Sequence, residues 1–383
     1  MGYRARMSHA PKPRLRDDHH LERHASWLEL FYDLVFAVTV SQLAHRLTLD
    51  LGPLEWAQFL GLFVPVWWAW VGQTMFATRF ESDDPVQRVL TLFQMLCAAI
   101  MAVQAGGVTH DRFQGFAIAY AALRTGLVLQ YLRVWRHDPS SRAVSGWLAG
   151  SFSVGVLCSI AAALAPASIA WMLWLLALVV DLAGPRLGVE RMRRAPVHRT
   201  HLPERFALFT LIFLGESLAA VVRGLAAADL WWSSVVIGVF AFVIASCLWW
   251  LYFDHFARAD VGERLHSGQT LLFMHLPLML ALAGLVAGVE RALQEASDLH
   301  LSPQTMAMVC GGAVLWLVSF VSLQAVTVPP TVAGRRKWPA IVGAGLVAML
   351  PWSELAWSPL LTFALVTTIL MALVVAHERR PRA

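Results

Sequence analysis

The stretch WLELFYDLVFAVTVSQLAHRL, residues 27–47, is long enough to cross a bilayer as a helix, at about 1.5 Å per residue against a core of about 30 Å. It nevertheless carries Glu29 and Asp33, followed by Gln42 and His45. Acids four residues apart share one helix face, and each is costly inside a bilayer unless it is paired or hydrated. Two interpretations follow. Either Glu29 caps the helix and Asp33 pairs with a neighbouring helix, or both acids belong to a solute or proton site.

Composition indicates the class of protein. Of the 383 residues, 58% are hydrophobic and only 14% are charged, which is too little charge for a soluble surface. We therefore predict an all-α, polytopic integral membrane protein with about twelve transmembrane helices. The expected spans are 27–47, 53–76, 88–107, 114–135, 143–165, 167–187, 203–225, 230–253, 270–290, 304–326, 337–351 and 355–377. The segment 337–351 is short for a full crossing.

The basic residues predict the orientation. Most of the 30 Lys and Arg residues fall in alternate loops and in the two terminal segments, 1–26 and 378–383. Cytoplasmic loops carry such an excess, so both termini are expected in the cytoplasm. Residues 1–26 contain no short apolar region with a cleavage site, so we expect the first span to be retained and not removed as a signal peptide.

The two halves of the chain resemble one another. Trp67-Trp68 matches Trp249-Trp250, Phe93 matches Phe273, and Glu29 matches Glu204, at offsets that differ only slightly. Such internal similarity predicts two parallel six-helix repeats. The first repeat would cover 27–190 and the second 203–377, joined by a basic cytoplasmic linker at 191–202.

Three motifs in order make the chain similar to a known family. They are ELFYDLVFA at 29–37, ERFALFTLIFLGES at 204–217 and WWLYFDH at 249–255. These resemble the bacterial low temperature requirement protein A family. The resemblance implies a multi-pass protein of the bacterial inner membrane linked to growth in the cold, with no settled substrate or reaction.

A looser likeness exists to potassium channels that carry a Phe-Ser-Asp motif in the first helix of each of two repeats. Phe31-Tyr32-Asp33 is similar to that motif, but Tyr32 replaces the serine. Leu208-Phe209-Thr210 stands at the corresponding place in the second half. A potassium pore built from two equivalent motifs is therefore not favoured.

Arg124 lies within an expected span. It cannot lose its charge, so it requires a carboxylate partner. Glu216, at similar depth in the seventh span and beside Gly215 and Ser217, is the first candidate, and Asp181 is the second. The pair would either fix helix packing or open when a coupling ion or an anion binds.

Three further polar residues have alternative roles. His275 precedes Pro277 and would either relay protons to Glu204 or Asp33, or bond to backbone that the proline frees. Asp254 and His255 end the eighth span, where a loop-facing role is favoured over a role in a site.

The sequence predicts no cofactor and no metal site. It contains no HExxH, P-loop, GxGxxG or spaced Cys/His pattern, and the four cysteines all lie in apolar segments. The net charge of +5 belongs to the loops and does not favour nucleic-acid binding. The expected partners are the lipid bilayer and a small solute or ion; homo-oligomerisation stays open.

The favoured function is that of a secondary transporter or ion-conducting protein. Its site is expected in a cytoplasm-facing cavity between the halves, lined by Glu29, Asp33, Glu204 and Glu216. One alternative is a membrane-embedded enzyme acting on a lipid or isoprenoid. It would gather its acids and histidines at the cytoplasmic face, from His24, Glu29, Asp33, His201, Glu204, Asp254 and His255. Another alternative is a structural or regulatory protein of cold adaptation.

Overall fold

The structure is a computed structural model, all-helical apart from one short strand pair. It describes residues 13–15, 25–48, 52–81, 84–105, 110–198, 200–227, 232–258, 269–327, 330–352 and 358–379. Most of the tail 1–26, His24 included, and residues 380–383 lie outside this part of the chain. The chain folds into two compact units. Unit 1 comprises residues 1–42, 60–205 and 266–268, and unit 2 comprises residues 43–59, 206–265 and 269–383.

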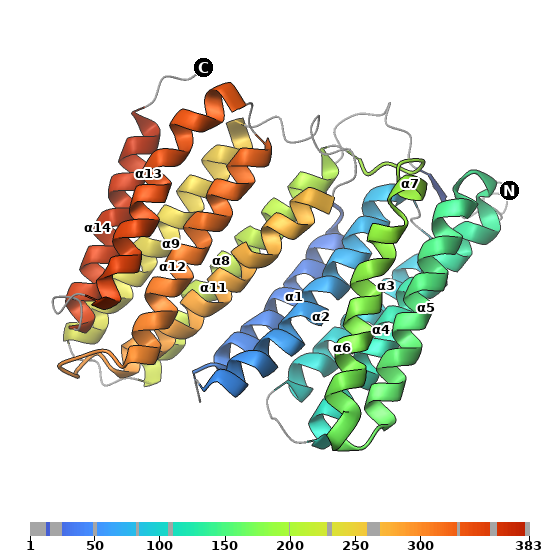
Figure 1. The fold of residues 1–383 in the computed structure, drawn as a ribbon, viewed down its shortest axis with the longest axis horizontal. Coiled ribbons are helices and arrows are strands. Elements are labelled where there is room, and N and C mark those ends of the chain that lie inside the picture. The colour runs from blue at the N-terminus through green and yellow to red at the C-terminus, as the bar shows by residue number, and fades with distance from the viewer. Residues whose placement is uncertain are drawn as a thin grey trace, which may run out of the picture. The chain divides into compact units, whose positions relative to one another are not determined.

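Unit 1 contains most of α1 (Trp27–Arg46) and α2 (Pro53–Arg79), followed by four helices that pack in chain order (Figure 1). These are α3 (Pro85–Gln104), α4 (His110–His137), α5 (Arg142–Leu164) and α6 (Ala167–Leu187). Short elements complete it: β1 (Arg14–Leu15), antiparallel to β2 (Phe80–Glu81), the 3-10 turn η1 (Pro139–Ser141), α7 (Val189–Met192) and the first residues of α8 (His201–Ala227). Aromatic rings hold its core, where Phe76 meets Tyr131 edge to face at 5.1 Å.

Unit 2 contains the rest of α8 and the helices that follow it (Figure 1). They are α9 (Trp232–Arg258), α11 (Gln269–Gln294), α12 (Pro303–Thr327), α13 (Pro330–Met349) and α14 (Pro359–Glu378), with the 3-10 turn η2 (Leu350–Trp352). α11 packs on α12, α12 on α13 and α13 on α14, while α14 also packs against α9. Unit 2 is therefore a helical bundle in which the last helix, α14, packs beside one of the first helices, α9.

Proline sets several helix starts. Five helices begin at a proline, namely Pro53, Pro85, Pro303, Pro330 and Pro359. Proline is favoured at the first helical position because its missing N–H would have no partner there and its φ angle is already helical. In α3 the preceding Asp84 also accepts a hydrogen bond from the Gln87 amide at 3.0 Å, a side-chain cap that satisfies one of the exposed N–H groups.

Eleven helices of the described chain are long and apolar enough to cross a membrane. Each coincides with an expected span to within a few residues at either end. The expected segment 337–351 is the exception. Its helix α13 begins seven residues earlier than expected and includes Arg335, Arg336 and Lys337, too much charge for a regular span. The parallel relation of two six-helix halves stays a prediction.

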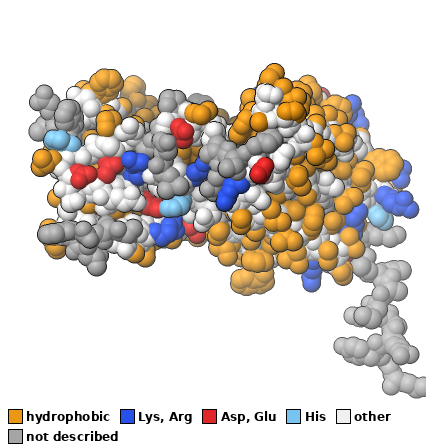
Figure 2. Space-filling model, turned by 90° about the horizontal axis from the view of Figure 1, so that it is seen from below, with side chains coloured by type: hydrophobic (Ala, Val, Ile, Leu, Met, Phe, Trp, Pro, Cys, Tyr) orange, Lys and Arg blue, Asp and Glu red, His pale blue; other side chains and the backbone are white. Residues whose placement is uncertain are grey.

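The surface fits a membrane environment. Large apolar side chains are exposed along the spans, for example Leu96, Leu157, Met172 and Val222. Figure 2 shows hydrophobic side chains over broad areas of one face, with charged side chains in small separate patches. Exposed apolar area on this scale marks contact with lipid or with another protein. Together with the eleven helices it identifies a polytopic membrane protein.

Candidate functional site

The acids of α1 lie on a common face, as the sequence predicts. Asp33 is fully buried, and its Oδ1 accepts hydrogen bonds from Trp70 Nε1 at 2.7 Å and from Arg205 Nη2 at 2.5 Å. Glu29, one turn nearer the helix start, lies 3.3 Å from Arg205 Nη1 and 3.4 Å from His201 Nε2. One buried guanidinium therefore joins both carboxylates.

Glu29 also caps its own helix. Its Oε2 accepts hydrogen bonds from the Ser26 amide at 2.7 Å and from Ser26 Oγ at 2.9 Å, and the Glu29 amide donates to Ser26 Oγ at 3.3 Å. This reciprocal arrangement is a capping box. Both contacts of the first interpretation are therefore present: Glu29 caps α1, and Asp33 pairs with Arg205 of a neighbouring helix. The second interpretation, a solute or proton site, stays a prediction.

Arg205 was not singled out from the sequence, where it stands at the start of the expected span 203–225. It lies in the second turn of α8, one turn after His201, so both side chains share a helix face. Only 1% of the Arg205 side chain is exposed. The sequence did contain a clue: Arg205 stands two residues after Pro203, inside an apolar helix. A cation buried in such a helix needs a partner of opposite charge.

A cavity of about 580 Å³ adjoins this network within unit 1. Its polar lining includes Glu29, Arg205, Tyr32, Gln73, Gln87 and Thr91. Its apolar lining includes Phe31, Phe76, Phe80 and Leu92. Pockets of a few hundred to about 1,000 Å³ with mostly apolar walls and a few polar groups are typical of small-molecule sites.

The other two acids predicted for the site are Glu204 and Glu216. Glu204 Oε1 accepts a weak hydrogen bond from the Ala25 amide at 3.4 Å. Glu216 belongs to unit 2 and is partly exposed. Its place in the same site as Asp33 stays a prediction.

A second buried ion pair lies deeper in unit 1. Arg124 Nη2 donates to Asp181 Oδ1 at 3.0 Å, and Tyr120 OH donates to Asp181 Oδ2 at 2.6 Å. Neither charged side chain is more than 1% exposed. The partner of Arg124 is therefore Asp181, the second candidate, and the expectation of Glu216 is corrected. The position of a residue within its span did not decide between Glu216 and Asp181 as the partner. The packing of α4, α5 and α6 brings Asp181 next to Arg124.

Two glycines leave space for this pair. A Cβ at Gly72 would lie 2.7 Å from Arg124 Nη1, and one at Gly155 would lie 2.3 Å from Asp181 Oδ1. Real Cβ atoms do not approach other atoms so closely. The Phe152 ring covers the guanidinium at 4.1 Å, a cation–π contact that adds stabilisation away from water.

His275 makes its described hydrogen bonds within unit 2. Its Nδ1 donates to the Leu271 carbonyl at 2.8 Å, and Tyr252 OH lies 2.8 Å from its Nε2. Pro277 lacks the N–H that would bond to the Phe273 carbonyl, so the bond to Leu271 does not compensate the proline. The predicted bond to backbone freed by Pro277 is therefore corrected, while the proton relay to Glu204 or Asp33 stays a prediction. Within unit 2, His275 joins α11 to α9.

The remaining predicted residues form separate contacts. His45 Nδ1 lies 2.7 Å from Glu290 Oε1, and Gln42 is exposed. Asp254 Oδ2 lies 2.7 Å from His377 Nε2, and His255 Nε2 lies 2.8 Å from Thr327 Oγ1. These acids and histidines form pairs within unit 2.

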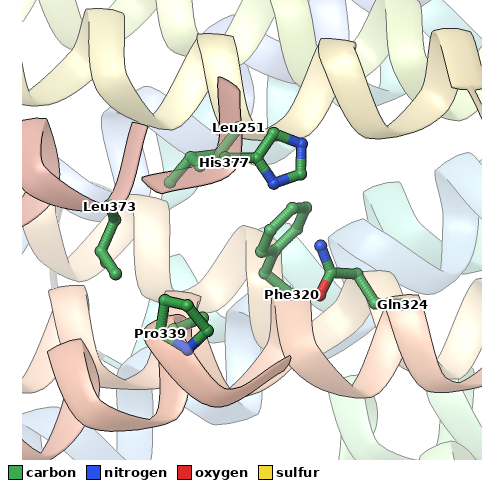
Figure 3. A pocket seen from close by; sticks show the side chains of 7 residues that line it. Leu251, Phe320, Gln324, Pro339, Leu373 and His377 are labelled. Carbon is green, nitrogen blue, oxygen red and sulfur yellow. The ribbon is translucent and has the colours of Figure 1, made fainter. Parts of the chain in front are cut away.

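A second cavity, in unit 2, is much smaller, at about 10 Å³. Figure 3 shows the Phe320 ring below His377 and next to Gln324, with Pro339 and Leu373 to the left. A space of this size holds about one water molecule. It does not suit a solute. Within the described chain, no three His, Cys, Asp or Glu side chains gather as metal ligands would.

Comparison with known proteins gives two findings. Residues 24–376 match the family model described as "Bacterial low temperature requirement A protein (LtrA)". The chain is also 26% identical over 322 residues to "Uncharacterized protein RA0937" of Rhizobium meliloti (strain 1021), covering 79% of this chain and 78% of that protein.

Proposed function

Since the chain belongs to the bacterial low temperature requirement A (LtrA) family, we propose that it is a secondary transporter or ion-conducting protein of the inner membrane. Its working site is the cavity of unit 1. The observation that carries the proposal is the bridge formed by Arg205 between Glu29 and Asp33 at the wall of a 580 Å³ cavity. Ionisable groups inside membrane-spanning segments mark solute or proton pathways by default.

The network is poised to accept another partner. Asp33 Oδ2 and Arg205 Nε are buried and have no hydrogen-bond partner among the described residues. A buried polar atom without a partner costs free energy, and each such atom needs an explanation. A bound ion or solute group, or water that accompanies it, provides one.

The charge balance favours a cationic or protonic partner. Glu29 and Asp33 carry two negative charges against the single positive charge of Arg205, counting His201 as neutral. A cation or proton that enters the network compensates the excess. Arg205 would then exchange partners as the solute binds and leaves, which is the step that couples binding to transport.

The orientation is part of the proposal. The excess of basic residues in the loops and tails favours a cytoplasmic location for both termini, and the two halves are proposed to be parallel repeats. The starts of α1, α3 and α8 and the end of α2 line the cavity, so it opens toward the cytoplasmic side. A reporter fused to the C-terminus that reads as external would contradict this topology.

The test is flux in proteoliposomes that contain the purified protein. A panel of cations, protons and small organic solutes is compared for the wild type, Asp33→Asn and the control Glu190→Gln. The Glu190 side chain is 79% exposed and pairs only with Arg193 among the contacts described. Flux that Asp33→Asn abolishes and Glu190→Gln preserves supports the proposal. Equal flux in all three proteins would show that Asp33 is not required for transport and would contradict the proposed site.

A further inference from the structure

The cavity of unit 1 opens between α1 and α3. Gln73 and Phe76 of α2 and Phe80 of β2 line it and are buried. By contrast, Phe31 of α1 is 50% exposed and Leu92 of α3 is 46% exposed. α2 therefore forms the back wall, and the two outer helices flank the opening.

Deeper in the unit, α1 and α3 close on each other. Tyr32 OH donates to Gln94 Oε1 at 3.2 Å, and Thr39 Oγ1 donates to the Ala98 carbonyl at 3.3 Å. The two helices are therefore joined beyond the cavity, which lies toward their N-terminal ends. In the proposed topology these ends lie at the cytoplasmic side, at the depth of the lipid head groups.

Beyond the cavity, each of the two helices carries a strip of exposed apolar side chains toward its C-terminal end. On α1 the exposed strip continues through Leu34 and Val38, and on α3 through Leu96 and Ile100. The spacing of three or four residues keeps each strip on one helix face. Such paired strips suit hydrocarbon chains that hang from a head group held in the cavity.

The inner part of the cavity offers hydrogen-bond acceptors. Gln73 is 5% exposed and Gln87 is 7% exposed, and the Oε1 atom of each has no partner in the described chain. Glu29 adds a carboxylate to the same lining. The two glutamine acceptors and the Glu29 carboxylate, which itself belongs to the Arg205 network, fit a group that both donates hydrogen bonds and carries positive charge.

The opening carries the opposite charge. Arg88 lies one turn before Leu92 on α3, is exposed and lines the cavity. A guanidinium is a favoured partner for phosphate oxygens. An ammonium group inside and a phosphate at the opening match the two ends of a zwitterionic head group.

We propose that the cavity binds an aminophospholipid, a lipid whose head group has a primary ammonium next to a phosphate. The ammonium lies among Glu29, Gln73 and Gln87, the phosphate contacts Arg88, and the acyl chains lie along the strips on α1 and α3. This assignment names the substrate class of the proposed transport site. Movement of the lipid rests on the proposed transport function, whereas binding of the lipid does not.

The experiment is a lipid-binding measurement on delipidated protein in detergent. Native mass spectrometry counts bound phosphatidylethanolamine, phosphatidylcholine and phosphatidylglycerol with identical acyl chains. We expect one tightly bound phosphatidylethanolamine per chain, with an affinity at least tenfold above that for phosphatidylcholine, which has no N–H donor. Equal binding of the three lipids would overturn the assignment. Soluble phosphoethanolamine that binds as tightly as the lipid would instead assign the site to a free head group.

Two variants with matched controls locate the site. Gln87→Leu removes an acceptor that has no protein partner, so the fold is preserved and the preference for phosphatidylethanolamine over phosphatidylcholine falls at least threefold. Arg88→Gln weakens binding of both lipids, whereas Arg136→Gln, at an exposed arginine of α4, leaves both unchanged. An unchanged preference in Gln87→Leu would place the lipid elsewhere. If the protein binds the lipid but transports no solute, the lipid assignment stands and the proposed transport function is contradicted.

Discussion

Unit 1 contains two buried arginine–carboxylate groups that differ in their surroundings. Arg124 and Asp181 are enclosed by Tyr120, Phe152 and two glycines, and neither lines the large cavity of the unit. Arg205 joins Glu29 and Asp33 at the wall of that cavity. The first group is enclosed by packing, whereas Glu29 and Arg205 of the second group line a cavity. Burial of charge alone therefore does not identify a site.

The largest effect is expected at the enclosed pair. Arg124→Leu leaves Asp181 buried without its cation and should lower the free energy of unfolding by roughly 3–5 kcal/mol. Adding Asp181→Leu removes the unpaired charge and should restore much of the loss. Thermal unfolding in detergent measures both variants. A double variant no more stable than Arg124→Leu would contradict a packing role for the pair.

The next effect tests the space around the same pair. Gly155→Ala places a Cβ 2.3 Å from Asp181 Oδ1 and should cost about 1–3 kcal/mol through overpacking. Gly150→Ala in the same helix meets no atom within 4 Å and should be neutral or gain up to about 1 kcal/mol of helix propensity. Equal melting temperatures for the two variants would mean that Asp181 can move aside.

A smaller loss of stability is expected at the cavity, together with a large loss of function. Asp33→Asn keeps the side-chain shape and leaves Glu29 to pair with Arg205, so unfolding should change by about 2 kcal/mol or less. Flux should nevertheless fall at least about tenfold, because the excess negative charge that attracts a cation is gone. Normal purification with unchanged flux would make Asp33 a structural residue like Asp181.

The smallest effect is expected at a surface pair. Arg193 and Glu190 are 66% and 79% exposed, so their attraction is screened by water and salt. Arg193→Ala should change stability by less than about 0.5 kcal/mol and leave flux unaltered. A larger loss would indicate that the segment after α7 contributes more to folding than its exposure suggests.

Most of the helical framework could be predicted from the sequence. Apolar length, proline at helix starts and charge in the loops are local properties, so the expected spans match the helices closely. α13 departs from the expectation because Arg335, Arg336 and Lys337 lie inside the helix and not before it. The positions of Glu29 and Asp33 on one face of α1 also followed from spacing alone.

The chain by itself determined membrane insertion, helix bounds and the presence of buried charge, because all three depend on residue type and on position along a helix. The tertiary structure decided which charges meet. Sequence position gives the depth of a side chain but not which neighbouring helix it faces, so Glu216 and Asp181 were both open as partners of Arg124 until packing selected Asp181. For the same reason Arg205, not singled out from the sequence, is in the structure the cation that joins Glu29 to Asp33.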